Sequence, residues 1–356
     1  MRRYAIFSPG FFTQSAAKTA HGVLAYSSDP SVVVIDPDHA GRRVRDVLPY
    51  LAGDAPIVAD LRSALAFKPT SLLVGVAPEG GALPSTWRTA IIAALEAGLE
   101  VVSGLHDELG KDPEFAAAAV RGKSSIWDVR VPPTVPLFSG AAYNVAPHVT
   151  LFVGSDCNVG KMTAALEVNR AARQRGIRSR FVATGQTGIM IAGSGIAIDR
   201  VVSDFAPGAA ERLVVEHAPG HDLLFIEGQG GINHPAYAPV TLALLYGSAP
   251  DSLILVHQAG RREIRTFGTP LLSYGELIDI YERLCATVKP ARVVGIALNT
   301  YGLDDAQAQE AIADARTQTG LPCADVVRNS PQALFSAIAP LLKGKGTRLR
   351  ANAQVA

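Results

Sequence analysis

The stretch HVTLFVGSDCNVGKMTAA, residues 148–165, decides the fold of this chain. Its apolar run at 148–154 predicts a buried strand, and the spacing after it predicts a helix over 160–175. The loop between them contains glycines that permit a tight turn and let backbone N–H groups approach an anion. The helix N-terminus adds its positive dipole end. The sequence therefore predicts a phosphate-binding strand–loop–helix, and with it a nucleotide or a nucleotide-bearing cofactor.

This loop differs from the common G-x-x-x-x-G-K-[ST] pattern in two ways. Five residues separate Gly154 from Gly160, and Met162 stands where a hydroxyl normally follows the lysine. We expect Lys161 to contact a terminal phosphate and Thr163 to contact a phosphate or Mg²⁺. The residues expected to bind the cofactor here are Gly154, Ser155, Asp156, Asn158, Val159, Gly160, Lys161, Met162 and Thr163.

Apolar runs and helical patterns alternate along the rest of the chain. Buried strands are expected at 4–8, 31–36, 71–77, 100–105, 148–154, 179–184, 222–228, 252–258 and 291–299. Helices are expected at 85–98, 160–175, 206–218, 235–247, 274–289, 304–319 and 331–343. This alternation predicts an α/β fold with parallel sheets and helices on both faces.

The length of 356 residues exceeds the usual limit of about 250–300 for a single core. The proline-rich VPPTVP at 131–136 favours an extended connection between two domains. We therefore expect a domain over 1–135, a linker over 136–147, a phosphate-loop domain over 148–345 and a flexible tail over 346–356. The first half has no G-x-G-x-x-G, so a turn or cap is favoured for Asp36 over ribose binding.

Polar residues follow several of the expected strands. Glu227 in IEGQGG is expected to hold Mg²⁺ through water or to act as a general base. His257 is a candidate proton shuttle, Arg261 a candidate clamp for a carboxylate or phosphate, and Asn299 a candidate reader of a purine edge. For each, a structural role is the alternative. The strand-end residues expected to contact substrate are Thr184, Gln186, Thr187, Gly188, Gly228, Gln229 and Gly230, together with Arg261.

The composition narrows the class of protein. The formal net charge is +1 and no basic helix stands out, so nucleic acid and membrane surfaces are not expected as partners. No apolar run reaches the roughly 18 residues of a membrane span. Three cysteines without a C-x-x-C pair favour a cytoplasmic protein with no structural metal site. Apolar helix faces favour a homo-oligomer.

Two resemblances sharpen these expectations. GSDCNVGKMT, TGQTG, IEGQGG and Asn299 resemble phosphate-loop proteins of the dethiobiotin-synthetase type, over about the second half of the chain. That likeness implies an ATP- and Mg²⁺-dependent ligase or kinase, with Thr163 and Glu227 as metal ligands.

Over nearly the whole chain, HGVLAY (21–26), VSGLHDELGKDPE (102–114), DVRVPP (128–133) and SDCNVGKMT resemble the DUF1611 family. A representative with an assigned activity is a D-glutamate N-acetyltransferase. The resemblance implies a Rossmann-like N-terminal domain and a P-loop NTPase-like, three-layer α/β/α C-terminal domain. It also implies transfer of acetyl from acetyl-CoA to the amino group of an acidic amino acid such as D-glutamate, in D-amino-acid catabolism.

For such an acetyltransferase, Glu227 is the first candidate base and His257 the second. Backbone N–H groups of 228–231 are candidates for the oxyanion. Arg261, Arg262 and Arg265 are candidate partners of a dicarboxylate. The competing interpretations are the ATP-dependent enzyme and a nucleotide-binding regulatory protein without catalysis.

Overall fold

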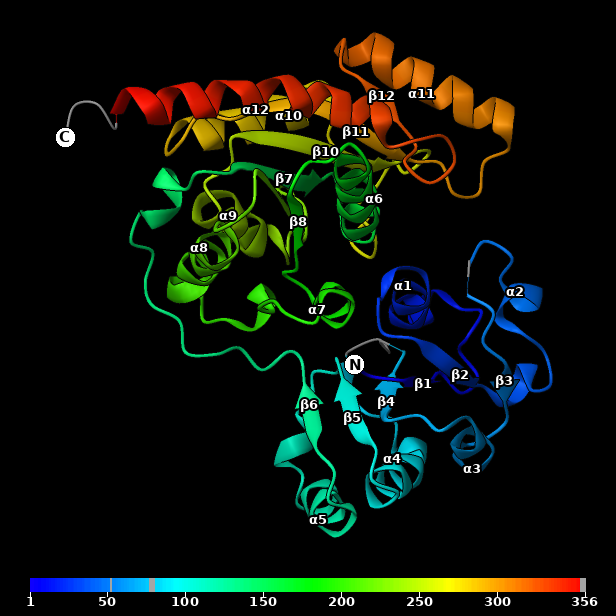
Figure 1. Cartoon of the computed structure of the whole chain (residues 1–356). Helices are drawn as coiled ribbons and strands as arrows, with labels where there is room; N and C mark the ends of the chain where they lie inside the picture. Colours follow the sequence, from blue (N-terminus) through cyan, green and yellow to red (C-terminus); the bar gives the residue numbers. More distant parts are fainter. Residues whose placement is uncertain (52, 77–80, 353–356) are drawn as a thin grey trace. The chain divides into compact units, whose positions relative to one another are not determined.

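The chain forms two compact units, drawn together in Figure 1. The computed structural model describes residues 1–51, 53–76 and 81–352, with 343–352 as helical backbone only. One unit comprises Met1–Pro132 with Gln186–Ala197, and the other Pro133–Gly185 with Ile198–Ala356. Each unit is built on its own six-stranded sheet, and every pair of neighbouring strands is parallel. The predicted α/β fold class is confirmed.

The first unit has the strand order β3-β2-β1-β4-β5-β6, which is the order of a Rossmann fold. Its strands are β1 (Tyr4–Phe7), β2 (Ser31–Ile35), β3 (Ile57–Val58), β4 (Ser71–Val74), β5 (Glu100–Ser103) and β6 (Ile126–Asp128). All four residues of the central β1 are buried. Near-continuous apolar character is what a parallel sheet with both faces covered requires.

The helices of the first unit include one that is distant in sequence. They are α1 (Lys18–Tyr26), α2 (Val44–Val47), α3 (Leu61–Ala64), α4 (Arg88–Glu96), α5 (Pro113–Gly122) and α7 (Gln186–Ala192). α7 packs against α1 although more than 150 residues separate them in the sequence. The chain therefore enters the second unit, returns to the first for one short segment, and leaves again.

The second unit has the strand order β12-β11-β10-β7-β9-β8. Its strands are β7 (His148–Gly154), β8 (Ser179–Val182), β9 (Leu223–Ile226), β10 (Ser252–Gln258), β11 (Arg292–Asn299) and β12 (Cys323–Ala324). The central strand, β7, is buried over its whole length. Because β7 lies between β9 and β10, the loop that follows it is flanked by the carboxyl ends of both.

The described part of the second unit also contains six α-helices. They are α6 (Lys161–Gln174), α8 (Ala206–His217), α9 (Ala238–Gly247), α10 (Tyr274–Ala286), α11 (Asp305–Thr319) and α12 (Gln332–Asn352). The segment expected as a linker, 136–147, lies in this unit, where Ser139 and Ala142 donate to the buried Glu211 of α8. In the described part of the chain, no helix is both long and apolar enough to cross a membrane.

Several expected elements differ from the observed ones. α12 continues to Asn352, past the expected end at 343, so the first part of the expected flexible tail 346–356 is helical, and 353–356 lie outside the described residues. α9 starts later and α10 ends earlier than expected. The short strands β3, β6 and β12 were not expected, because two or three residues are too few for an alternation pattern.

Candidate functional site

The phosphate loop joins the carboxyl end of β7 to the first turn of α6. Asn158 and Gly160 have left-handed backbones, with φ of +54° and +107°, which turn the chain tightly into the helix. Among the described residues, the N–H groups of Val159, Gly160 and Lys161 find no hydrogen-bond acceptor. Free N–H groups at a helix N-terminus bind anions readily, so the geometry suits a phosphate group.

The ammonium group of Lys161 lies inside this loop. Its Nζ donates to the carbonyl oxygens of Asp156 and Gly230, both at 2.7 Å. Gly154 makes room for it, because a Cβ there would lie 2.7 Å from Nζ. Burial lowers the pKa of Lys161 to about 8. The lysine thus connects the phosphate loop with the glycine-rich segment after β9.

Glu227 follows β9 directly and its side chain is buried. Its Oε2 accepts hydrogen bonds from the backbone N–H groups of Thr184 (2.9 Å) and Gly185 (3.1 Å). Its Oε1 has no such bond from any described residue. Burial raises the pKa of Glu227 to about 7, against the lowering effect of those N–H groups and of Lys161. A carboxyl group with this pKa and one open oxygen is suited to general-base chemistry.

The glycine-rich segment after Glu227 packs directly on the phosphate-loop strand. A Cβ on Gly228 would lie 1.7 Å from the carbonyl oxygen of Phe152, so only glycine fits. Gly230 has a left-handed backbone, with φ of +62°. The amide of Gln229 donates to the carbonyl of Thr184 at 2.5 Å. The predicted residues Thr184, Glu227, Gln229 and Gly230 therefore lie together, around one loop junction.

Arg261 anchors the phosphate loop. Its Nη1 donates to Asp156 Oδ2 and to the carbonyl of Cys157, both at 2.8 Å, and the Asp156 side chain is fully buried. The same Oδ2 accepts from the backbone N–H of Arg265 at 3.1 Å. The guanidinium that the sequence assigns to substrate is therefore already bound to a carboxylate of the protein.

A hairpin over 262–271 carries the two neighbouring arginines. It is closed by backbone hydrogen bonds from Leu271 to Arg262 (2.9 Å) and from Ile264 to Thr269 (2.7 Å). The side chains of Arg262 and Arg265 are exposed and make no ion pair with any described residue. Because Asp156 accepts the backbone N–H of Arg265, both exposed guanidinium groups are carried by a segment that is bound to the phosphate loop.

Asp156, Cys157 and His234 place possible metal-ligand atoms within 4.8 Å of one another. The imidazole tautomer argues against a metal there. Nδ1 of His234 accepts the backbone N–H groups of Ala236 and Tyr237, at 3.1 and 3.2 Å. The proton of the neutral ring is therefore on Nε2, the nitrogen that faces Asp156 at 3.7 Å, and it blocks coordination. His234 caps the start of the segment that leads into α9.

Two predicted strand-end residues support the phosphate loop from β10 and β11. Nδ1 of His257 lies 2.9 Å from Ser155 Oγ, and burial lowers the pKa of His257 to about 4. A neutral imidazole of such low basicity is a poorer general base than Glu227. The amide of Asn299 donates to the carbonyl of Val159 at 3.3 Å and accepts from the N–H of Tyr301 at 3.0 Å. Its purine-reading role stays a prediction.

The segment TGQTG does not form a single polar loop. Thr184 and Gly185 belong to the second unit, whereas Gln186, Thr187 and Gly188 begin α7 in the first unit. The apolar residues after Gly188 are buried, and this burial explains why the segment continues as a helix.

Tyr281 is a residue of the site that sequence reasoning missed. It extends from α10, is fully buried, donates to the carbonyl of Gly154 at 2.7 Å and accepts from the N–H of Ile232 at 3.1 Å. It therefore connects the start of the phosphate loop with the end of the glycine-rich segment. A single tyrosine in an amphipathic helix carries no signal that separates this role from ordinary core packing.

Comparisons with known proteins agree with this architecture. The profile of a P-loop domain of unknown function, the C-terminal DUF1611 domain, matches residues 136–335, and that of the Rossmann-like DUF1611 N-terminal domain matches 37–132. The chain belongs to the DUF1611 family. The crystal structure of a DUF1611 family protein from Anabaena variabilis is similar, with a TM-score of 0.91 and 40% identity, over 96% of this chain and 100% of that one.

Two curated relatives of this DUF1611 protein are named D-glutamate N-acetyltransferase. The one from Tritonibacter scottomollicae is 37% identical over 315 residues, which cover 85% of this chain and 91% of the relative. The one from a Pseudoalteromonas species is 38% identical over 270 residues, which cover 75% and 80%.

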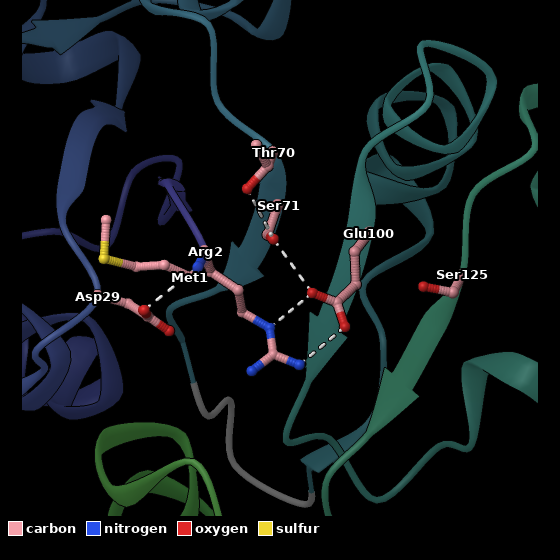
Figure 2. Close-up of a pocket in the computed structure, with 7 residues that line it drawn as sticks. All are labelled: Met1, Arg2, Asp29, Thr70, Ser71, Glu100 and Ser125. Carbon is pink, nitrogen blue, oxygen red and sulfur yellow. Dashed lines mark hydrogen bonds and ion pairs between the residues drawn. The ribbon is translucent and has the colours of Figure 1, made fainter.

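The first unit of the DUF1611 fold has an open pocket of about 610 Å³, shown in Figure 2. It lies at the amino ends of the strands, opposite the carboxyl ends where open α/β sheets bind ligands. Arg2 and Glu100 point toward each other there, with nitrogen–oxygen distances of 2.6 and 2.9 Å, and Ser71 donates to the same carboxylate. Arg2 and Glu100 neutralise each other in this pocket, which indicates a structural ion pair.

Replacing Tyr281 by Phe tests the connection through its hydroxyl. We expect the free energy of unfolding to fall by about 1–3 kcal/mol, because the buried carbonyl of Gly154 and the partly buried N–H of Ile232 lose their partner. Denaturant unfolding of the full chain measures it. Tyr4→Phe is the matched control, because the hydroxyl of Tyr4 is equally buried and has no partner among the described residues. An equal loss in both variants would contradict the assignment.

Proposed function

We propose that this DUF1611 protein transfers an acetyl group from acetyl-CoA to the amino group of D-glutamate, as a step in D-amino-acid catabolism. The observation that carries the proposal is the carboxyl group of Glu227, with a pKa near 7 and one open oxygen, beside a phosphate loop. The names of the two curated relatives support the same activity. An amine must lose a proton before it attacks a thioester, and a base of this pKa removes it efficiently near neutral pH.

The phosphate loop fits the diphosphate of such a donor. Donors for phosphate oxygens come from the N–H groups of Val159, Gly160 and Lys161, which find no acceptor among the described residues. The Lys161 ammonium adds its third N–H, because the other two bind carbonyl oxygens. Because Met162 follows the lysine, the hydroxyl lies one residue later, on Thr163. A loop that only binds phosphates tolerates this shifted position of the hydroxyl. When bound, acetyl-CoA supplies the thioester carbon that the amine attacks.

We assign the deprotonation of the amine, the binding of the oxyanion and the binding of the acceptor to residues around this loop. Thr184 and Gly185 hold Oε2 of Glu227, which leaves Oε1 to take the proton of the amine. The N–H groups of 228–231 donate to no described residue and are available to a developing oxyanion. The exposed guanidinium groups of Arg262 and Arg265 offer partners for the carboxylates of the acceptor.

One observation favours a second candidate function. A carboxylate beside a phosphate-loop lysine also suits Mg²⁺ binding, with Thr163 as the other ligand. This arrangement is what an ATP-dependent ligase or kinase needs. A regulatory nucleotide-binding protein would share the loop without using Glu227.

A turnover assay with two readouts separates these functions. With acetyl-CoA and D-glutamate, we expect free thiol to be released, with no effect of EDTA. Acetyl-CoA at 100 times its Kd should also stabilise the protein by about 2.7 kcal/mol in thermal unfolding. ADP release that requires Mg²⁺ would instead identify the ATP-dependent enzyme. Binding of either ligand without turnover would indicate the regulatory protein.

Glu227→Gln tests the base. We expect kcat to fall by about 10²–10⁴-fold, because the amide cannot accept the proton. In the wild type, the carboxylate must be ionised, so kcat/KM should fall as pH drops through about 7. Initial rates from pH 5 to 9 measure both effects.

Glu167→Gln is the control. Glu167 is a buried glutamate on α6 that pairs with Arg170, so this variant should keep full activity. Full kcat in Glu227→Gln would contradict the assignment of Glu227 as the general base.

Arg265→Ala tests recognition of the acceptor. We expect KM for D-glutamate to rise about tenfold, equivalent to ~1.4 kcal/mol, with KM for acetyl-CoA unchanged. Steady-state kinetics with each substrate varied in turn measures this. Arg283→Ala is the control, because Arg283 is exposed and its one ion pair with a described residue is to Asp279 on α10. A rise in KM for acetyl-CoA alone would place Arg265 at the donor instead.

A further inference from the structure

The strand order of the first unit places its ligand crevice at the switch point between β1 and β4. In open α/β sheets, ligands bind outside the carboxyl ends of the strands at this point. In this chain, α7 lies there. Thr187, in its first turn, contacts Thr19 in the first turn of α1, and the two hydroxyl oxygens are 3.0 Å apart. Both side chains are buried.

The other side of α7 packs on the end of β5. A Cβ on Gly104, directly after β5, would lie 2.0 Å from the side-chain amide of Gln186 and 3.1 Å from Cε of Met190. Because β4 lies between β1 and β5 in the sheet, α7 extends across the carboxyl end of β4. The place that a dinucleotide occupies in a Rossmann fold is filled by a segment of this chain.

The carboxylate that would bind a ribose in a Rossmann fold is bound to other groups of this chain. Asp36 follows β2, is fully buried, accepts the N–H of Gly10 at 2.7 Å and pairs with Nδ1 of His39. Gly10 belongs to the turn after β1, where a pyrophosphate would lie. Neither the carboxylate nor the turn is left open for a nucleotide.

α7 is continuous with the residues that hold Glu227. The chain passes from the second unit to the first between Gly185 and Gln186, and the N–H groups of Thr184 and Gly185 donate to Glu227 Oε2. Whatever anchors α7 therefore also limits where these two N–H groups lie. We propose that the Rossmann-like unit is a receptor for α7, and that Thr19 and Thr187 are positioning residues for Glu227. The second part rests on the proposed function.

Three single variants of the protein test this. Thr187→Val leaves the hydroxyl of Thr19 without its partner, and Thr187→Ser retains the pair. Thr150→Val is the matched control, because Thr150 and Ser252 form a buried hydroxyl pair of the same length, 3.0 Å, in the second unit. Hydrogen exchange over 184–192 reports on the anchoring of α7 whether or not the protein acetylates anything.

We expect amide exchange over 184–192 to accelerate by about tenfold in Thr187→Val and to stay near the wild-type rate in the other two variants. NAD⁺ and NADP⁺ should not raise the thermal midpoint of the wild type. Unchanged exchange in Thr187→Val, or stabilisation by either dinucleotide, would overturn the receptor role.

The kinetic consequence is measured separately. If the N–H groups of Thr184 and Gly185 hold Glu227 less firmly, its carboxylate is misplaced for the amine. We therefore expect kcat to fall by about tenfold in Thr187→Val, with KM for acetyl-CoA unchanged and with the wild-type kcat retained in Thr187→Ser. An unchanged kcat in Thr187→Val together with faster exchange would overturn the positioning role alone. Absence of acetyl transfer by the wild type would count against the proposed function and leave the exchange test intact.

Discussion

The buried carboxyl group of Glu227 constrains much of the structure around it. A charged group removed from water needs hydrogen-bond donors, and Glu227 obtains them from the backbone of Thr184 and Gly185. This pairing fixes the end of β8 against the end of β9. It also determines where the chain leaves the second unit to form α7. Its pKa, near 7, results from the balance between burial and these two donors.

Polar side chains hold the loops around the phosphate site in place. Asp156 binds the guanidinium of Arg261 and the backbone N–H of Arg265 in the arginine hairpin, and Tyr281 connects the two glycine-rich segments. Loops rich in glycine have little side-chain packing of their own, so such bonds replace it. In this arrangement, Arg261 is bound within the loop region, and the exposed Arg262 and Arg265 make no ion pair with any described residue.

The Rossmann-like unit illustrates that a fold does not specify a ligand. Its strand order creates a crevice at the switch point, but Asp36 binds its own neighbouring turn and α7 covers the strand ends. The unit thus retains the architecture of a dinucleotide-binding domain while the groups that would contact a dinucleotide bind the protein itself. In the phosphate loop of the second unit, the N–H groups of Val159, Gly160 and Lys161 find no acceptor among the described residues, and the proposed chemistry is assigned there.

The sequence by itself determined the α/β class, the central strands and the phosphate loop, because these depend on local patterns. Apolar runs and a glycine–lysine turn entering a helix are visible over 148–165 without any tertiary contact. It also singled out Glu227, since a carboxylate at a strand end is a local feature.

Only the tertiary structure decided which groups contact that carboxylate, that Arg261 is already bound, and that Tyr281 connects two loops. The division of TGQTG between the units was equally invisible, because the burial of α7 depends on α1, more than 150 residues away. Hydrogen-bond partners and desolvation are set by residues distant in sequence, and no local pattern encodes them.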